Sequence, residues 1–200
     1  MSNDYKYVDP DYVYTDPKTG VLRNLENIST YKALTFAETT ATARRAKELR
    51  AHPILVESAD TLFAIHRYLF QDIYKWAGKK RTVEISKGGK QFFPLQRFDT
   101  ALLHIDSLIA AYKRINRDDK QALSRKLAEI LDSVNYLHPF REGNGRAQRE
   151  LLRLLALEKG WKLNLNPPDN AAVYERYMAG TISGDKGILA ELIFECLNGD

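Results

Sequence analysis

Cysteine is almost absent from this 200-residue sequence, which contains only Cys196. A lone cysteine excludes an internal disulfide and a zinc site built from several cysteines, and it is typical of a reducing compartment. Uninterrupted apolar runs are only a few residues long, so no segment could span a bilayer as a helix. The first residues also lack the basic and apolar regions of a secretory signal. We therefore expect no membrane partner and no disulfide-stabilised fold.

Proline and glycine are few as well, at 7 and 11 residues, while hydrophobic residues make up 44% and charged residues 28% of the chain. This balance excludes a collagen-like, low-complexity or disordered chain. A chain of this length buries roughly 70% of the surface that its unfolded form exposes. We expect an N-terminal arm rich in Tyr, Asp and Pro over residues 1–27, followed by a single domain over residues 28–200.

The net charge is +4, and one short segment accounts for it. Residues 79–97 contain six Lys or Arg and one Glu, a net charge of +5, so the rest of the chain is close to neutral. A nucleic-acid-binding module would spread basic residues along a face, with aromatic residues between them. The concentration of charge in one segment disfavours that function, and we expect no direct nucleic-acid partner.

Hydrophobic periodicity predicts a mostly helical bundle. In residues 120–137, for example, the apolar side chains recur at helical spacing and mark one buried face. Similar patterns, with their breaks, predict helices at residues 29–50, 58–76, 98–115, 120–137, 146–159, 170–180 and 186–197.

The ends of the first two helices carry specific signals. Asn27 or Ser29 can cap the N-terminus of the first helix, because their side chains accept hydrogen bonds from free backbone N–H groups. That helix should stop before His52, which precedes a proline and is therefore disfavoured in α geometry. The second helix should run to Trp76, because Gly78 follows it as a stop signal.

Residues 82–94 show the two-residue period of a β-hairpin. Residues 82–86 alternate in polarity, residues 87–90 contain the turn, and residues 91–94 return. Pro94 lacks a backbone N–H and would confine the second strand to a sheet edge. The predicted fold class is therefore mainly α, a helical bundle with one short β-hairpin.

The residue types suited to anion binding and catalysis occur together in one segment, residues 138–149, HPFREGNGRAQR. A helix ends, a loop with two glycines follows, and a new helix begins. Backbone N–H groups in a Gly-x-Gly loop at a helix N-terminus form an anion cradle, which the helix dipole reinforces. Arg146 and Arg149 lie three residues apart on one helical face and add positive charge. These features predict a phosphate site.

Two further residues of this segment suit catalysis. Glu142 stands at the mouth of an anion cradle, where an acid is unfavourable for binding phosphate directly but suits Mg²⁺ on a polyphosphate. His138 is the only histidine near the loop, and imidazole has the pKa range of a general base. The simpler interpretation is a tight interhelical turn, but a turn requires neither the histidine, the acid nor the arginines.

The segment resembles the signature of Fic-domain proteins, H-x-F-x-[DE]-G-N-G-R-x-x-R, at all of its fixed positions. Residues 65–81 resemble the family's helix leading to its hairpin, and residues 83–94 resemble its target-docking flap. Residues 12–24 resemble the entry arm of stand-alone bacterial Fic toxins and of Fic domains in secreted effectors. The resemblance implies a Fic-type helical bundle with a Fic catalytic domain over residues 28–200.

What the resemblance implies is protein adenylylation, the transfer of AMP from ATP to a Tyr, Thr or Ser hydroxyl with release of pyrophosphate. His138 would deprotonate the incoming hydroxyl, Phe140 would anchor the loop in the core, and Glu142 would hold Mg²⁺ on the phosphates. The residues that would bind the nucleotide phosphates are Gly143, Asn144, Gly145, Arg146 and Arg149. Transfer of another nucleotide or of a phosphocholine-like group, or removal of AMP, would use the same site.

The flap, residues 82–94, is expected to dock the target. Its first strand, residues 82–86, is expected to be a short edge strand with unpaired backbone groups. An extended target segment can then add to it as a further strand and hold its hydroxyl beside His138. The candidate docking residues are Glu84, Ile85, Ser86, Lys87 and Gly88.

Regulation is inferred from an absent motif. Many Fic proteins carry an inhibitory helix with the pattern [ST]-x-x-x-E-[GN], whose Glu pairs with the second motif arginine, here Arg149. In this sequence Glu precedes Gly or Asn only at Glu26 and Glu142, and Leu22 and His138 stand four residues earlier. The pattern is missing, so we expect a separate small antitoxin near the arm and the first helix. A bacterial toxin would act in the bacterial cytoplasm, and a secreted effector in the host cytosol.

Overall fold

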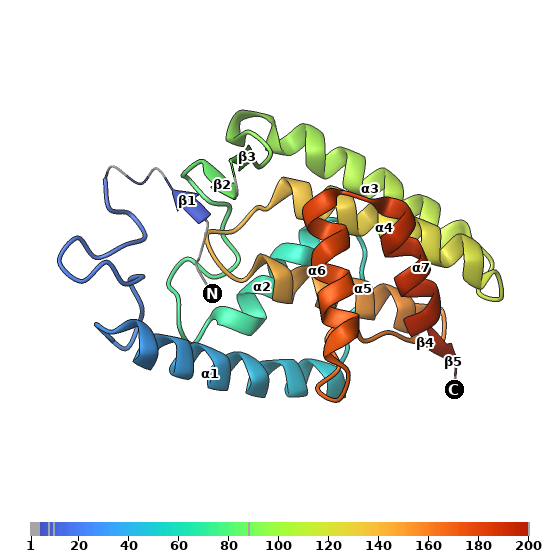
Figure 1. Ribbon diagram of the computed structural model, residues 1–200, viewed down its shortest axis with the longest axis horizontal. Helices are drawn as coiled ribbons and strands as arrows, with labels where there is room; N and C mark the ends of the chain where they lie inside the picture. Colours follow the sequence, from blue (N-terminus) through green and yellow to red (C-terminus); the bar gives the residue numbers. More distant parts are fainter. Residues whose placement is uncertain (1–4, 8, 10, 88, 200) are drawn as a thin grey trace.

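Helices make up most of the computed structural model, which describes residues 5–7, 9, 11–87 and 89–199 (Figure 1). This confirms the predicted mainly α class. The helices are α1 (Tyr31–Ala51), α2 (Asp60–Phe70), α3 (Phe98–Arg114), α4 (Lys120–Leu137), α5 (Asn144–Glu158), α6 (Ala171–Ser183) and α7 (Lys186–Cys196). The strands are β1 (Tyr5–Tyr7), β2 (Ile85–Lys87), β3 (Lys90–Gln91), β4 (Trp161–Lys162) and β5 (Asn198–Gly199).

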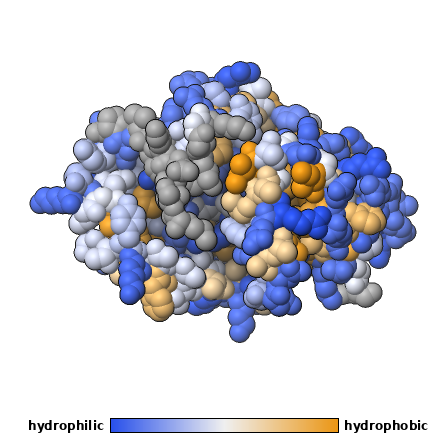
Figure 2. Space-filling view, in the orientation of Figure 1, coloured by the Kyte–Doolittle hydropathy of each residue, from blue (hydrophilic) through white to orange (hydrophobic). Residues whose placement is uncertain are grey.

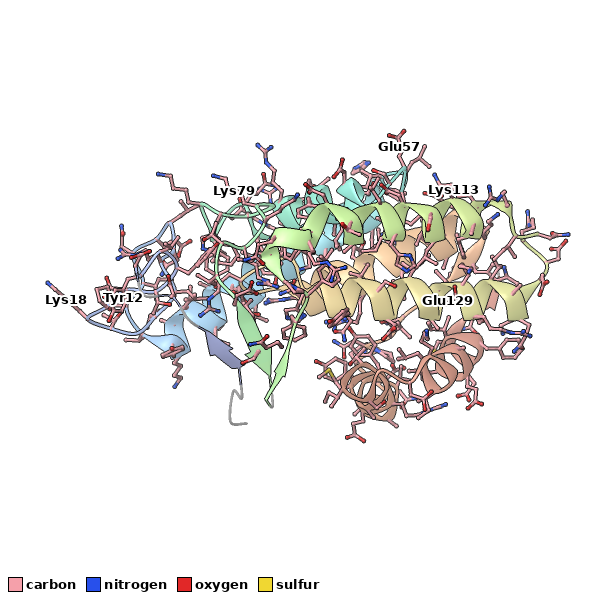
Figure 3. All side chains as sticks on the ribbon, turned by 90° about the horizontal axis from the view of Figure 1, so that it is seen from above. Tyr12, Lys18, Glu57, Lys79, Lys113 and Glu129 are labelled. Carbon is pink, nitrogen blue, oxygen red and sulfur yellow. The ribbon has the colours of Figure 1, made fainter. Side chains whose placement is uncertain are left out.

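Helix α4 forms the centre of the bundle. Its periodic residues Leu123, Leu127, Ile130, Leu131 and Val134 are all at most 2% exposed, which confirms the predicted buried face. In the view from above, α3 runs alongside α4 while α6 and α7 are seen end-on and cross beneath them (Figure 3). Because α4 is covered from several sides, the loop that follows it starts from a fixed position.

Two predicted helix ends were wrong. The N-cap of α1 is Thr30, whose side chain accepts a hydrogen bond from the N–H of Ala33, whereas Asn27 has a positive φ of 55°. Helix α2 ends at Phe70, six residues before Trp76. The apolar spacing continued beyond Phe70 because Ile73, in the turn that follows, is also buried at 2% exposure.

The other helices follow the prediction closely. Helices α3 and α4 end within one residue of the expected positions, and α6 and α7 differ by at most three residues at either end. Helix α5 begins at Asn144, two residues earlier than predicted. Gly143 precedes it with a φ of 84°, so the left-handed turn sits directly at the helix start.

The hairpin belongs to a three-stranded antiparallel sheet in the order β1-β2-β3. Strand β3 is at an edge, as predicted from Pro94, and Ser86 of β2 pairs with Gln91. The first hairpin strand, however, is central and not an edge, because β1 of the N-terminal arm pairs with its other side, Tyr7 opposite Ile85. No local pattern signals this pairing, because the two segments lie almost 80 residues apart in the sequence.

Residues 11–27 of the arm lie at one end of the molecule, where Figure 3 shows Tyr12 and Lys18 pointing outward. Tyr14 instead packs inward at 4% exposure, and its hydroxyl accepts a hydrogen bond from the Thr82 N–H at 3.0 Å. Hydrophilic residues cover most of the face in Figure 2, with small groups of hydrophobic ones between them. Within the described part of the chain, every helix is too short or too polar to cross a membrane.

Candidate active site

The loop between α4 and α5, residues 138–143, is named the phosphate loop. It begins at His138, which ends α4 in a left-handed conformation with a φ of 45°. It ends in Gly143, where a Cβ atom would lie 2.3 Å from Cζ of Phe70. Only glycine satisfies both the positive φ and this close approach. Gly145 has no such backbone requirement, because its φ is that of an ordinary helix.

His138 is buried to 7% exposure at the edge of a cavity of about 980 Å³. Its Nδ1–H donates to the carbonyl of Asn135 at 3.2 Å, and its ring stacks on Phe92 of the flap with centroids 3.8 Å apart. With Nδ1 protonated, Nε2 carries the ring's lone pair. The side chain is therefore oriented and in the tautomer that a general base requires.

The interior of the phosphate loop rests on a buried aromatic stack. Phe140 is fully buried, and its ring lies 3.7 Å from that of His66, which in turn stacks on Phe70 at 4.5 Å. His66 Nδ1 accepts from the N–H of Gly78, so Nε2 carries the proton and donates to the carbonyl of Glu142 at 2.9 Å. Burial lowers the pKa of His66 to about 3, which keeps the ring neutral.

His66 is a functional residue that sequence reasoning missed. It lies within the second predicted helix, residues 58–76, and in the structure it packs in the core at 0% exposure. Its link to Glu142, 76 residues away, leaves no local pattern in the sequence.

The side chain of Asn144 forms hydrogen bonds with the backbone of the phosphate loop. Its Oδ1 accepts from the N–H of Phe140 at 2.9 Å and its Nδ2 donates to the carbonyl of the same residue at 2.8 Å. The side chain, predicted to help cradle phosphate, is thus used to shape the loop. In the described part of the chain, the backbone N–H groups of Asn144 and Gly145 have no acceptor and open the N-terminus of α5 to an anion.

The two motif arginines, Arg146 and Arg149, contact different parts of the structure. Arg149 lies 5.3 Å from the ring centroids of both Tyr174 and Tyr177, within the large cavity. Arg146 stacks over Phe70 at 4.6 Å and pairs with Glu38 of α1 at 2.5 Å. Both arginines also line a second cavity of about 610 Å³ between α1 and α5.

Glu38 is a second residue that the sequence did not reveal. It lies on α1, 108 residues before Arg146, and is only 12% exposed. Its carboxylate also accepts a hydrogen bond from the hydroxyl of Tyr74. Burial, followed by the nearby Glu38 charge, raises the pKa of that hydroxyl.

The Fic/DOC family model matches residues 57–156, which include α2, the flap and the whole phosphate loop. The chain belongs to this family. It is 31% identical over 184 residues to a probable protein adenylyltransferase of Sinorhizobium fredii, y4lH, covering 90% of this chain and 91% of that protein.

A second relative of this Fic domain is the protein adenylyltransferase VbhT of Bartonella schoenbuchensis, 34% identical over 160 residues. That match covers 80% of this chain but about a third (34%) of VbhT. Among solved structures, the BepC effector of Bartonella tribocorum with bound AMPPNP has a TM-score of 0.81 at 18% identity, covering 94% of this chain and 98% of that one. At that identity the match shows the fold alone.

The one carboxylate that the phosphate loop offers as a ligand fits a magnesium ion held mainly by substrate. Glu142 is one third exposed and faces the cavity, with Oε1 accepting from the Gly143 N–H at 2.9 Å and lying 3.6 Å from Arg146. No cluster of three metal-ligating side chains occurs among the described residues. One carboxylate together with phosphate oxygens is a usual set of ligands for Mg²⁺.

The flap of the Fic domain borders the same cavity through Gln91, Phe92 and Phe93. Of the candidate docking residues, Ile85 is buried at 2% exposure, and Glu84 accepts hydrogen bonds at the base of the flap. Ser86 is half-buried, the backbone of Lys87 lies in β2, and Gly88 falls outside the described residues. The backbone of β2 is paired on both sides, with β1 and with β3.

Proposed function

We propose that this Fic domain transfers AMP from ATP to a hydroxyl group of a target protein. The observation that carries the proposal is one cavity holding an oriented histidine, an open helix N-terminus and Arg149. Both relatives described above are named as protein adenylyltransferases, one of them as probable. Positioning and charge neutralisation supply most of the catalysis in phosphoryl transfer, and this cavity offers both.

His138 Nε2 takes the proton from the target's Tyr, Thr or Ser hydroxyl as its oxygen attacks the α-phosphorus. A bond forms between that oxygen and phosphorus, and the bond from phosphorus to the bridging oxygen of the β-phosphate breaks. Pyrophosphate leaves with the electron pair. A positioned base contributes about 10²–10⁴-fold to such a rate.

The phosphates occupy the N-terminus of α5. The N–H groups of Asn144 and Gly145 bind them there, and Arg149 neutralises the terminal charge. Glu142 would hold Mg²⁺, which when bound supplies charge neutralisation on the α- and β-phosphates. Tyr174 and Tyr177 line the same cavity and border the space left for the base.

The target docks by strand addition to the flap. Because β1 occupies the side of β2 that faces away from β3, we propose that a target segment takes the place of β1. Displacing three residues of a short strand costs little, since an isolated strand pair of this length is marginal.

Labelled ATP tests the function. Purified protein and a His138→Ala control are incubated with α-labelled ATP, Mg²⁺ and either bacterial or mammalian lysate. Label should enter at least one protein, and the control should reduce it at least 100-fold. No transfer, or transfer that survives the substitution, would contradict the proposal. The responding lysate separates a bacterial toxin from an effector acting in a host cell.

Parallel reactions test the alternatives that share this site. Labelled CTP, GTP, UTP and CDP-choline replace ATP in one series, and a pre-adenylylated protein replaces the lysate in another. ATP should give the fastest transfer. A faster reaction with another donor, or loss of AMP from the modified protein, would assign the site to that chemistry.

We propose that a separate antitoxin helix occupies the second cavity. Small side chains of α1, including Ala43 and Ala46, border it, and basic groups such as Arg50 and Arg153 line its walls. An acidic residue of the partner would reach Arg149 from this side and compete with nucleotide for it. The unpartnered chain should therefore be active; if it bound ATP but labelled nothing in either lysate, this part would be contradicted.

A further inference from the structure

Arg81 is a buried cation that lies outside the Fic motif. Its side chain is 0% exposed, although it stands between the half-exposed Lys80 and the exposed Thr82. Burying a guanidinium is costly unless its donors are satisfied. Burial accordingly lowers the pKa of Arg81, while Glu84 acts in the opposite direction.

The acceptors of Arg81 belong to two different parts of the site. Nε donates to the carbonyl of His138 at 2.9 Å, and the backbone N–H donates to the carbonyl of Pro139 at 2.8 Å. Nη1 donates to the carbonyl of Val83, just before β2 of the flap, at 2.7 Å. Nη2 donates to the carbonyl of Phe93, just after β3, at 2.6 Å. One residue therefore joins both ends of the flap, before β2 and after β3, to the start of the phosphate loop.

Other links join the flap to the body at single points. The Phe93 N–H donates to the carbonyl of Tyr136 at 3.0 Å, and the Thr82 N–H donates to the hydroxyl of Tyr14 at 3.0 Å. Ring contacts add the stack of Phe92 on His138 and the edge contact of Phe93 with Tyr136. The sheet itself consists of strands of two and three residues. Such a small sheet does not hold its own position without packing or cross-links to a larger body.

We propose that Arg81 is a positioning residue for adenylyl transfer, which sets the flap, and so the docked target hydroxyl, at a fixed place relative to His138. Its bond to the His138 carbonyl also supports the left-handed backbone of that residue. Lysine could not replace it, because an ammonium group lacks the planar fork that reaches three separate carbonyls. This inference rests on the proposed function of the flap as the target-docking element.

Steady-state kinetics separate positioning from general stability. The target is the protein labelled most strongly in the lysate experiment, purified, and ATP affinity is measured separately with a non-hydrolysable analogue. Arg81→Met should raise KM for the target about 10-fold and lower kcat about 10-fold, since a misplacement near 1 Å can cost up to about 100-fold. ATP affinity should stay within twofold. The KM and kcat of Arg81→Lys should lie between those of Arg81→Met and those of the unaltered protein.

Arg44→Met is the matched control. It removes an arginine of the same size, on α1, whose side chain is 62% exposed and pairs with Asp72 in the turn after α2. The control should leave both kinetic constants unchanged. If Arg81→Met matches the control within twofold, or if ATP affinity falls in parallel with turnover, the positioning role is overturned.

Hydrogen exchange gives a readout that needs no target. In Arg81→Lys, the N–H groups of Phe92 and Phe93 should exchange at least 10-fold faster, while those of α4 keep their protection. Flap exchange at the unaltered rate would overturn the inference even if Arg81→Met did not fold. Absence of labelling by the unaltered protein would instead contradict the proposed function.

Discussion

The phosphate loop and the flap border one cavity, but they are held in different ways. The loop rests on buried side chains of the main core, with Phe140 and His66 both at 0% exposure. The flap rests on a small separate cluster of Tyr14, Val83 and Ile85, on short strand pairs and on Arg81. The proposed nucleotide site is therefore part of the stable core of the domain, whereas the flap, the proposed docking element, is held by a few links that can change independently.

His66→Ala should have the largest effect on stability. It removes the ring between Phe70 and Phe140 and leaves the Glu142 carbonyl and the Gly78 N–H without partners. The free energy of unfolding should fall by about 3–5 kcal/mol, measured by urea denaturation, and ATP affinity should fall with it. A loss below about 1 kcal/mol would mean that the loop does not depend on the core.

Gly143→Ala tests the loop at its closest approach to the core. The new Cβ would meet the Phe70 ring at 2.3–2.9 Å and would strain a φ of 84°. We expect a loss of about 2–4 kcal/mol in unfolding free energy. Gly145→Ala is the control, because its Cβ would meet only the flexible end of Arg149 at 3.2 Å. Equal losses at the two positions would contradict this account.

The buried histidine also predicts a pH dependence. Because the pKa of His66 is about 3 in the folded chain and ordinarily 6.5, the unfolded chain binds its proton first. Its contribution to stability is therefore complete above pH 6.5 and declines by about 1.4 kcal/mol per pH unit below it, or about 2 kcal/mol by pH 5. Unfolding curves of the unaltered protein and of His66→Gln isolate this slope. Parallel curves from pH 7.5 to 5 would refute it.

A smaller effect is expected for Glu38→Gln, which keeps the shape of the side chain but removes its charge. The amide oxygen can still accept from Arg146, and the amide N–H can donate to the oxygen of the Tyr74 hydroxyl, so the loss should be about 1 kcal/mol. Glu129→Gln removes a more exposed carboxylate paired with Lys126, and it should change stability by less than about 0.5 kcal/mol. If the two variants lost the same amount, Glu38 would have no special role at the loop.

Removing β1 from the flap should change the kinetics and leave the free energy of unfolding almost unchanged. A chain lacking residues 1–8 leaves the outer side of β2 unpaired, so KM for the target should fall about 3- to 10-fold if target and β1 compete for one edge. ATP affinity should not change. A higher KM would show instead that targets add to the outer side of β1.

Local patterns predicted much of the fold and of the site. Helix α4 was placed to the residue, because its apolar period, its start and its end are all local. The twelve-residue segment from His138 to Arg149 brought the base, the acid and the arginines together, because they lie within one loop and one helix start. The end of α2 was misplaced because Ile73 is buried in a turn and still matches the helical period.

By itself, the sequence determined the mainly helical class, the anion-binding loop and the chemistry that its residues can perform, since each of these follows from neighbours along the chain. Only the tertiary structure decided that β1 covers the flap edge, that Asn144 shapes the loop, and that His66, Glu38 and Arg81 support the site. Except for the bond of Asn144, these contacts join residues that lie 57 to 108 positions from each other in the sequence. Burial and hydrogen-bond satisfaction select such partners only after the helices have packed, so no local pattern records them.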